Sequence, residues 1–341
     1  MKVFIWGNSI FSNDMQWGFE QAGCDAKVVL IPDIQTLQHI LEKEKPDLML
    51  TMGAPIEFKD DVLEELGKRA SSSMKYIHWD TDGISSTYYR PVLGDGIEMD
   101  LINRSKPDLV LTMCPDMQRF IRGKHIPCEM MHYAYSPEAH RPLAGYENDS
   151  YYINLIGNGY YEFYQRHPGH YRYTSFKTLV KPLLENGYQV HFYGDTGYRL
   201  LFKSLLGMDV PESSFHHIMP YEKTCACYNS SFINLVTQNH EHTITKRTFE
   251  ILGSGGFALS YDNAALRELF VPGRDLAVTK SPEQTLELVE YYKKNQDAWL
   301  QVRKNAVQSV QGHTYRQRAE YILGLIFAMP RCHGDGSPVT L

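Results

Sequence analysis

Lys45-Pro-Asp-Leu-Met-Leu-Thr-Met-Gly53 is the stretch that indicates the fold, and it nearly recurs as Lys106-Pro-Asp-Leu-Val-Leu-Thr-Met-Cys114. In each copy a proline ends the preceding helix, an aspartate precedes the strand, and an apolar run enters a sheet. Two copies are too few for a solenoid. They are typical of consecutive strand–helix units.

The same alternation extends over both halves of the chain. Short apolar runs predict strands at 3–6, 27–30, 48–52, 75–78 and 109–112, then at 152–156, 190–193, 232–236 and 257–260. Amphipathic patterns predict helices at 35–43, 60–68, 176–186, 283–295 and 315–328. Strands that alternate with helices indicate an α/β protein with parallel sheets covered on both faces.

A polar, turn-rich stretch over 135–150 interrupts the pattern and indicates a boundary. A chain of 341 residues also exceeds the usual size of a single core. We therefore expect an N-terminal domain over 1–145, a second domain over 150–312, a helix over 313–329 and a disordered tail over 330–341.

Composition excludes several classes of protein. A net charge of −6 argues against a nucleic-acid partner. The sequence has no apolar run of 18 residues, so no transmembrane segment is expected, and the first residues resemble a strand and not a signal peptide. Six scattered cysteines suit a reducing cytoplasm, and Cys225-x-Cys227 lacks a second ligand pair for zinc.

Arg247-Thr-Phe-Glu250-Ile-Leu-Gly-Ser-Gly-Gly-Phe257 combines a cation and an acid on one helical face with a glycine-rich turn. Arginine offers a forked donor for diphosphate oxygens, and glutamate can accept two ribose hydroxyls. The alternative is an exposed salt bridge worth a few tenths of a kcal/mol.

Gly157-Asn158-Gly159 follows a predicted strand and could approach a phosphate, or could be an ordinary turn. A complete G-x-G-x-x-G is missing, which argues against a dinucleotide dehydrogenase.

The order and spacing from Arg247 to His313-Thr-Tyr315 resemble the C-terminal half of the CgeB-like spore-maturation glycosyltransferases. The resemblance covers roughly residues 150–328. It implies the GT-B fold, in which two doubly wound Rossmann-like domains face each other across a cleft and a C-terminal helix crosses back to the first domain. It also implies a metal-independent glycosyltransferase of hexosyltransferase type, without a cofactor, that uses a nucleoside-diphosphate sugar.

The resemblance also suggests the donor residues. Gly157 and Asn158 would lie near the phosphates, with Lys246 and Arg247 as cations and Glu250 on the ribose. Gly194 would keep the cleft open beside the donor. His217 and Met219 belong to a segment that lies along the nucleotide base in related enzymes. The first acid of the family's paired-glutamate motif would fall at His242, so this chain departs from the motif there.

His78-Trp-Asp80-Thr-Asp82-Gly83 is the sharpest cluster of the N-terminal half. His78 and Asp80 could position or deprotonate an acceptor hydroxyl, with Asp82, Asn8 and Ser9 on the acceptor side. Asp80-x-Asp82 also has the spacing of a metal-binding pair, and an aspartate-rich turn is the structural alternative.

The resulting hypothesis is transfer of a sugar to a saccharide or another hydroxyl acceptor. A nucleotide-sugar epimerase on the same fold and a non-catalytic saccharide-binding or coat protein remain as alternatives.

Overall fold

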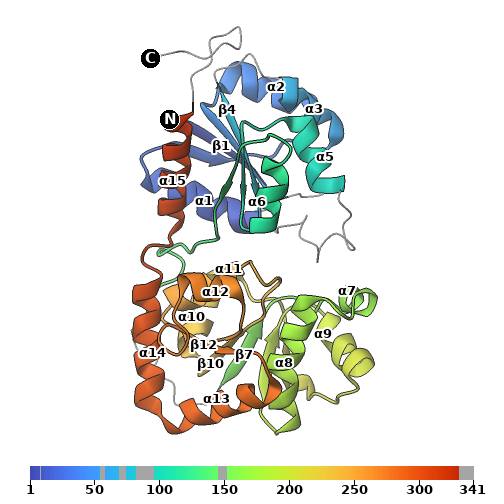
Figure 1. Ribbon diagram of the computed structural model, residues 1–341, viewed down its shortest axis with the longest axis vertical. Helices are drawn as coiled ribbons and strands as arrows, with labels where there is room; N and C mark the ends of the chain where they lie inside the picture. Colours follow the sequence, from blue (N-terminus) through green and yellow to red (C-terminus); the bar gives the residue numbers. More distant parts are fainter. Residues whose placement is uncertain (8, 54–57, 69–73, 82–95, 145–151, 330–341) are drawn as a thin grey trace. The chain divides into compact units, whose positions relative to one another are not determined.

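The computed structural model describes residues 1–7, 9–53, 58–68, 74–81, 96–144 and 152–329 (Figure 1). The predicted tail over 330–341 lies outside these residues. The chain divides into two compact units, Met1–Ser136 with the residues from His313 on, and Pro137–Gly312.

The first unit contains a six-stranded parallel sheet in the order β2-β1-β3-β4-β5-β6. Its strands are β1 (Lys2–Gly7), β2 (Asp25–Val28), β3 (Leu48–Met52), β4 (Lys75–Asp80), β5 (Leu109–Thr112) and β6 (Cys128–Met130). Its helices are α1 (Ser9–Gln21), α2 (Ile34–His39), a π-helical turn η1 (Ile40–Glu44), α3 (Asp60–Gly67), α5 (Gly96–Ser105), α6 (Pro115–Arg122) and α15 (Tyr315–Ala328).

The second unit repeats this plan with a sheet in the order β12-β11-β10-β7-β8-β9. Its strands are β7 (Ile153–Ile156), β8 (Val190–Tyr193), β9 (Phe215–His216), β10 (Ile233–Val236), β11 (Ala258–Tyr261) and β12 (Ala277–Thr279). Its helices are α7 (Tyr161–Arg166), α8 (Tyr171–Glu185), α9 (Gly197–Leu200), η3 (Leu201–Leu206), η4 (Glu212–Ser214), α10 (Tyr221–Ser230), α11 (Lys246–Gly253), α12 (Ala264–Leu269), α13 (Pro282–Lys294) and α14 (Gln296–Ser309).

Each sheet is buried among its own helices. Phe4, Trp6, Met49, Tyr76 and Val110 lie in the core of the first unit. Ile153, Leu155, Phe192, Phe257 and Trp299 lie in the core of the second. The predicted architecture of two Rossmann-like domains is confirmed, and the last helix packs against α1 of the first unit (Figure 1).

Candidate functional site

The turn after β7 brings Gly157 against Arg247 of α11. Gly157 has a φ of 150°, which favours glycine. A Cβ at this position would lie 3.1 Å from Nη2 and 3.2 Å from Nη1 of Arg247. The guanidinium therefore occupies the space that any larger residue at position 157 would need.

The turn after β8 packs onto the same place. A Cβ on Gly194 would lie 2.0 Å from the carbonyl oxygen of Gly157, so only glycine fits there. Asp195 Oδ1 accepts hydrogen bonds from the backbone N–H groups of Gly159 and Gly197, at 2.9 and 3.0 Å. Asn158, between Gly157 and Gly159 in the turn after β7, is exposed. Asp195 thus holds the two turns together.

Three buried donor atoms at this sheet edge lack a hydrogen-bond partner among the described residues. They are Arg247 Nε, the Tyr198 hydroxyl and the Thr237 hydroxyl. Thr237 directly follows β10, and β10 is the neighbour of β7 with Asn234 opposite Asn154. Buried donors are normally paired, and the ends of parallel strands are where ligands of such sheets bind. The arrangement suits a ligand rich in acceptor oxygens.

A second arginine lies close to this turn. The guanidinium carbon of Arg172, near the start of α8, lies 4.5 Å from the ring centroid of Tyr160, and Arg172 Nη1 donates to Asn239. The positive charges of Arg172 and Arg247 both act on the buried Tyr198 hydroxyl, whose pKa is nevertheless raised because burial dominates. Sequence reasoning gave Arg172 no role, because nothing in its local pattern separates it from an ordinary helix residue.

Glu250 lies one turn along α11 from Lys246, and the two side chains form a buried ion pair. Lys246 Nζ lies 2.7 Å from Glu250 Oε1 and donates to the Tyr221 hydroxyl at 2.9 Å. Burial by itself would raise the pKa of Glu250, but Lys246, His140 and Arg247 outweigh it and lower this pKa to about 2. Glu250 is therefore a buried carboxylate that stays ionised at neutral pH.

His140 and Tyr228, whose ring centroids lie 5.9 Å apart, complete this cluster, and no sequence pattern pointed to either residue. His140 is fully buried, and its Nε2 lies 2.9 Å from Thr224 Oγ1 on α10. His140 lies against α10 because the chain that follows it is hydrogen-bonded to this helix. Asn229 Oδ1 of α10 accepts from the N–H of Leu143 at 3.0 Å. Lys246, which the sequence predicts as an additional cation near the phosphates, is the direct ion-pair partner of Glu250.

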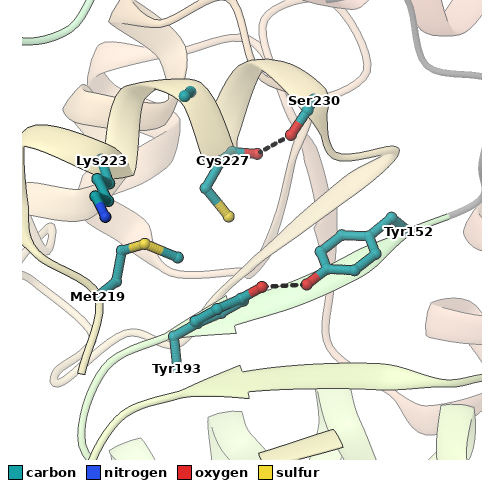
Figure 2. A pocket seen from close by; sticks show the side chains of 7 residues that line it. Tyr152, Tyr193, Met219, Lys223, Cys227 and Ser230 are labelled. Carbon is teal, nitrogen blue, oxygen red and sulfur yellow. Dashed lines mark hydrogen bonds between the residues drawn. The ribbon is translucent and has the colours of Figure 1, made fainter. Parts of the chain in front are cut away.

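The other face of α10 borders a pocket of about 320 Å³ (Figure 2). The residues that line it are Tyr152, Tyr193, Met219, Lys223, Ala226, Cys227 and Ser230. Of the two predicted base-segment residues, Met219 lines this pocket, and His217 is exposed outside its lining. Neither Arg247 nor Glu250 contributes to it.

The predicted acceptor-side residues of the first unit are buried where the structure describes them. His78 Nδ1 lies 2.9 Å from Thr51 Oγ1, and Asp80 Oδ2 accepts from Thr112 Oγ1 at 2.7 Å. Both side chains are fully buried. Asn8 and Asp82 lie outside the described residues, and of Ser9 only its place at the start of α1 is described.

Residues 166–324 match a family model described as "Glycosyl transferase-like". No curated protein matches the chain. In the described parts of the chain, no helix is long and apolar enough to cross a membrane, and no group of three or more His, Cys, Asp or Glu side chains could hold a metal ion.

Several solved structures share the fold. Sucrose-phosphate synthase from Thermosynechococcus elongatus has a TM-score of 0.67 at 11% identity, covering 96% of this chain and 98% of that one. Anabaena HepE in complex with UDP has a TM-score of 0.64 at 11% identity, and the match covers 96% of this chain and 100% of HepE. UDP-GlcNAc 2-epimerase from Neisseria meningitidis, bound to UDP-GlcNAc, has a TM-score of 0.55 at 13% identity. The match covers 96% of this chain and 100% of the epimerase chain. At these identities the likeness shows the fold, which is of the predicted GT-B type. The narrower CgeB-like resemblance stays a prediction.

Proposed function

We propose that the protein is a glycosyltransferase that takes a sugar from a nucleoside-diphosphate donor. One observation carries this proposal: the Arg247 guanidinium lies against the turn at Gly157, with a buried Nε that has no acceptor among the described residues. A diphosphate would supply oxygens for that atom and for the neighbouring orphaned hydroxyls. The match of residues 166–324 to a glycosyl transferase-like family supports the same reading.

The donor would be gripped by residues of the second unit. Arg247 and Arg172 supply positive charge for the diphosphate, and Glu250 accepts from the ribose hydroxyls. Lys246 keeps Glu250 ionised, so that the carboxylate can act only as an acceptor. Negative charge that develops on the leaving phosphate is stabilised by the arginines, and the proposed reaction needs no metal.

The acceptor would be a saccharide or another molecule with a free hydroxyl. His78 and Asp80 stay the predicted positioning or base residues, with Asn8, Ser9 and Asp82 beside them. A general base contributes about 10²–10⁴ in rate, and it must reach the proton that it removes. Because His78 Nδ1 and Asp80 Oδ2 each have a threonine partner, the proposed role requires that an acceptor hydroxyl reach the other nitrogen or oxygen of the side chain, or displace that threonine.

The test is nucleotide binding by an Arg247→Ala variant. UDP, GDP and ADP are titrated by calorimetry in buffer that contains EDTA, first with the wild-type protein. The loss of a charge-assisted contact of about 1.5–3 kcal/mol predicts at least tenfold weaker binding of whichever nucleotide binds. Arg166→Ala is the matched control, because Arg166 is exposed and paired only with Glu162 among the described residues. Equal affinities of the two variants would remove Arg247 from the site, and binding that requires Mn²⁺ would contradict metal independence.

An epimerase is the second candidate, since the fold is shared with UDP-GlcNAc 2-epimerase. Incubation of the bound nucleotide sugar without an acceptor separates the two. A new sugar epimer that still carries its nucleotide would identify an epimerase, whereas acceptor-dependent release of nucleoside diphosphate would identify a transferase. A protein that binds no nucleotide would fit the third, non-catalytic alternative.

A further inference from the structure

Stacked aromatic rings form one wall of the pocket beside α10. The ring of Tyr152 stacks on His191 with centroids 4.1 Å apart, and the ring of Tyr193 stacks on His216 at 4.5 Å. The two imidazoles are themselves joined, with His191 Nδ1 2.9 Å from His216 Nε2. Burial lowers the pKa of both histidines, so these rings are neutral at pH 7. Walls that are fixed in advance reduce the entropy that a ligand's binding would cost.

Sulfur atoms and aromatic rings line the inside of this pocket. In Figure 2 the Met219 thioether and the Cys227 thiol point toward the two tyrosine rings. Burial raises the pKa of Cys227 to about 11, so the sulfur stays a neutral thiol. Sulfur atoms and aromatic faces make favourable contacts with planar rings. A volume of about 320 Å³ is at the lower end of the range for ligand pockets, which favours a single ring.

The charged and polar groups at this pocket are mainly donors. Lys223 lines the pocket and forms no ion pair with any described residue, and none of the seven lining residues is acidic. The hydroxyls of Tyr152 and Tyr193 bond to each other (Figure 2), which leaves one of the two O–H groups to donate elsewhere. A ligand here must therefore bring acceptors, and a carboxylate would also meet the charge of Lys223.

We propose that this pocket is a second ligand site, separate from the donor site, that binds a small planar ring bearing a carboxylate. The ring lies between the sulfurs and the tyrosines, and the carboxylate faces Lys223 and the tyrosine hydroxyls. Binding of this ligand does not rest on the proposed transferase function. The effect of the ligand on donor binding does rest on that proposed function.

That consequence follows from the two faces of α10. Lys223 and Cys227 border the pocket, whereas Tyr221 and Thr224 contact the cluster around Glu250 through Lys246 and His140. A ligand that shifts this helix changes the position of Tyr221, and any effect on nucleotide affinity must be reciprocal. The pocket ligand is thus an effector of the proposed donor site.

The experiment uses 4-hydroxybenzoate as the probe, with binding followed by ligand-observed NMR on the full chain. We expect saturable binding that Lys223→Met and Tyr193→Phe each weaken at least fivefold. Lys203→Met is the control, since Lys203 is an exposed lysine of the same unit outside the pocket, and it should bind the probe like the wild type.

A second measurement separates this site from the donor site. A saturating nucleoside diphosphate should leave the probe able to bind. It should change the dissociation constant of the probe by a finite factor and not abolish its binding. Full competitive displacement would assign the pocket to the nucleotide and overturn the proposal, as would the absence of saturable probe binding. If the probe binds but no nucleotide does, the pocket stands and the transferase proposal fails.

Discussion

Glu250 is the residue at which charge, burial and the proposed chemistry meet. Only 8% of its side chain is exposed, as for Lys246, and its pKa is nevertheless lowered to about 2. A carboxyl whose pKa is lower in the folded chain stabilises the fold above the unfolded pKa of about 4.5. That contribution, on the order of 3 kcal/mol, is lost as the pH falls from about 4.5 toward 2. We therefore expect the second unit to be sensitive to acid.

The Lys246→Met variant tests this ion pair. It leaves the buried carboxylate without its nearest cation, and breaking a buried pair costs about 3–5 kcal/mol. The double variant Lys246→Met with Glu250→Gln removes both charges and should recover a substantial part of that loss. Free energies of unfolding from urea titrations at pH 7 give the comparison. A double variant no more stable than Lys246→Met alone would show that the pair contributes packing and not charge compensation.

At the scale of elements, two neighbouring strands of the second sheet share the sequence Ile-Asn-Leu. Asn154 of β7 and Asn234 of β10 lie side by side beneath α10, and Asn154 Nδ2 donates to Asn234 Oδ1 at 3.0 Å and to Ser231 Oγ at 2.5 Å. Asn234 Nδ2 in turn donates to the carbonyl oxygen of Tyr228 at 3.1 Å. The two asparagines fasten the helix that separates the Glu250 cluster from the pocket.

An Asn154→Leu variant should therefore destabilise the protein by about 1–3 kcal/mol, because it strips buried acceptors of their donor. Asn305→Ala is the control at a less buried asparagine, with an expected change within about 0.5 kcal/mol. Urea unfolding midpoints of the two variants provide the measurement. Equal midpoints would mean that the Asn154–Asn234 pair can be replaced by apolar packing at no cost.

Local patterns predicted the central elements, and failed where neighbours determine the structure. The strands at 48–52, 109–112 and 190–193 were predicted to the residue because apolar runs between turn residues have few alternatives. The edge strands β6, β9 and β12 have only two or three residues each, too short for a pattern. Likewise, Arg247 and Glu250 followed from the motif, whereas Arg172 and His140 are close to them only because of the fold. The i,i+4 spacing of Lys246 and Glu250 could have indicated their pair.

For the whole molecule, the first unit is assembled from both ends of the chain. The chain leaves it after Ser136 and returns at His313, and the N–H of Tyr315 donates to the carbonyl oxygen of Tyr135 at 3.1 Å. Thr314 and Gln317 form a capping box at the start of α15. Arg318 of the same helix donates to the carbonyl oxygens of His132 and Tyr133, at 2.8 and 3.0 Å. The last helix is thus part of the structural core of the first unit.

Gly18 sets how closely that last helix can approach. A Cβ at Gly18 of α1 would lie 2.3 Å from the Tyr315 carbonyl oxygen, closer than real contacts allow. Gly18→Ala should therefore push α15 away and destabilise the first unit by about 1–3 kcal/mol, although alanine favours a helix. Gly324→Ala, on α15 itself, meets no atom within 4 Å and should stabilise the protein by about 0.5–1 kcal/mol. Limited proteolysis after α14 and urea unfolding of both variants measure the difference. If Gly18→Ala is as stable as Gly324→Ala, then the packing of α1 on α15 does not hold the two ends of the chain together.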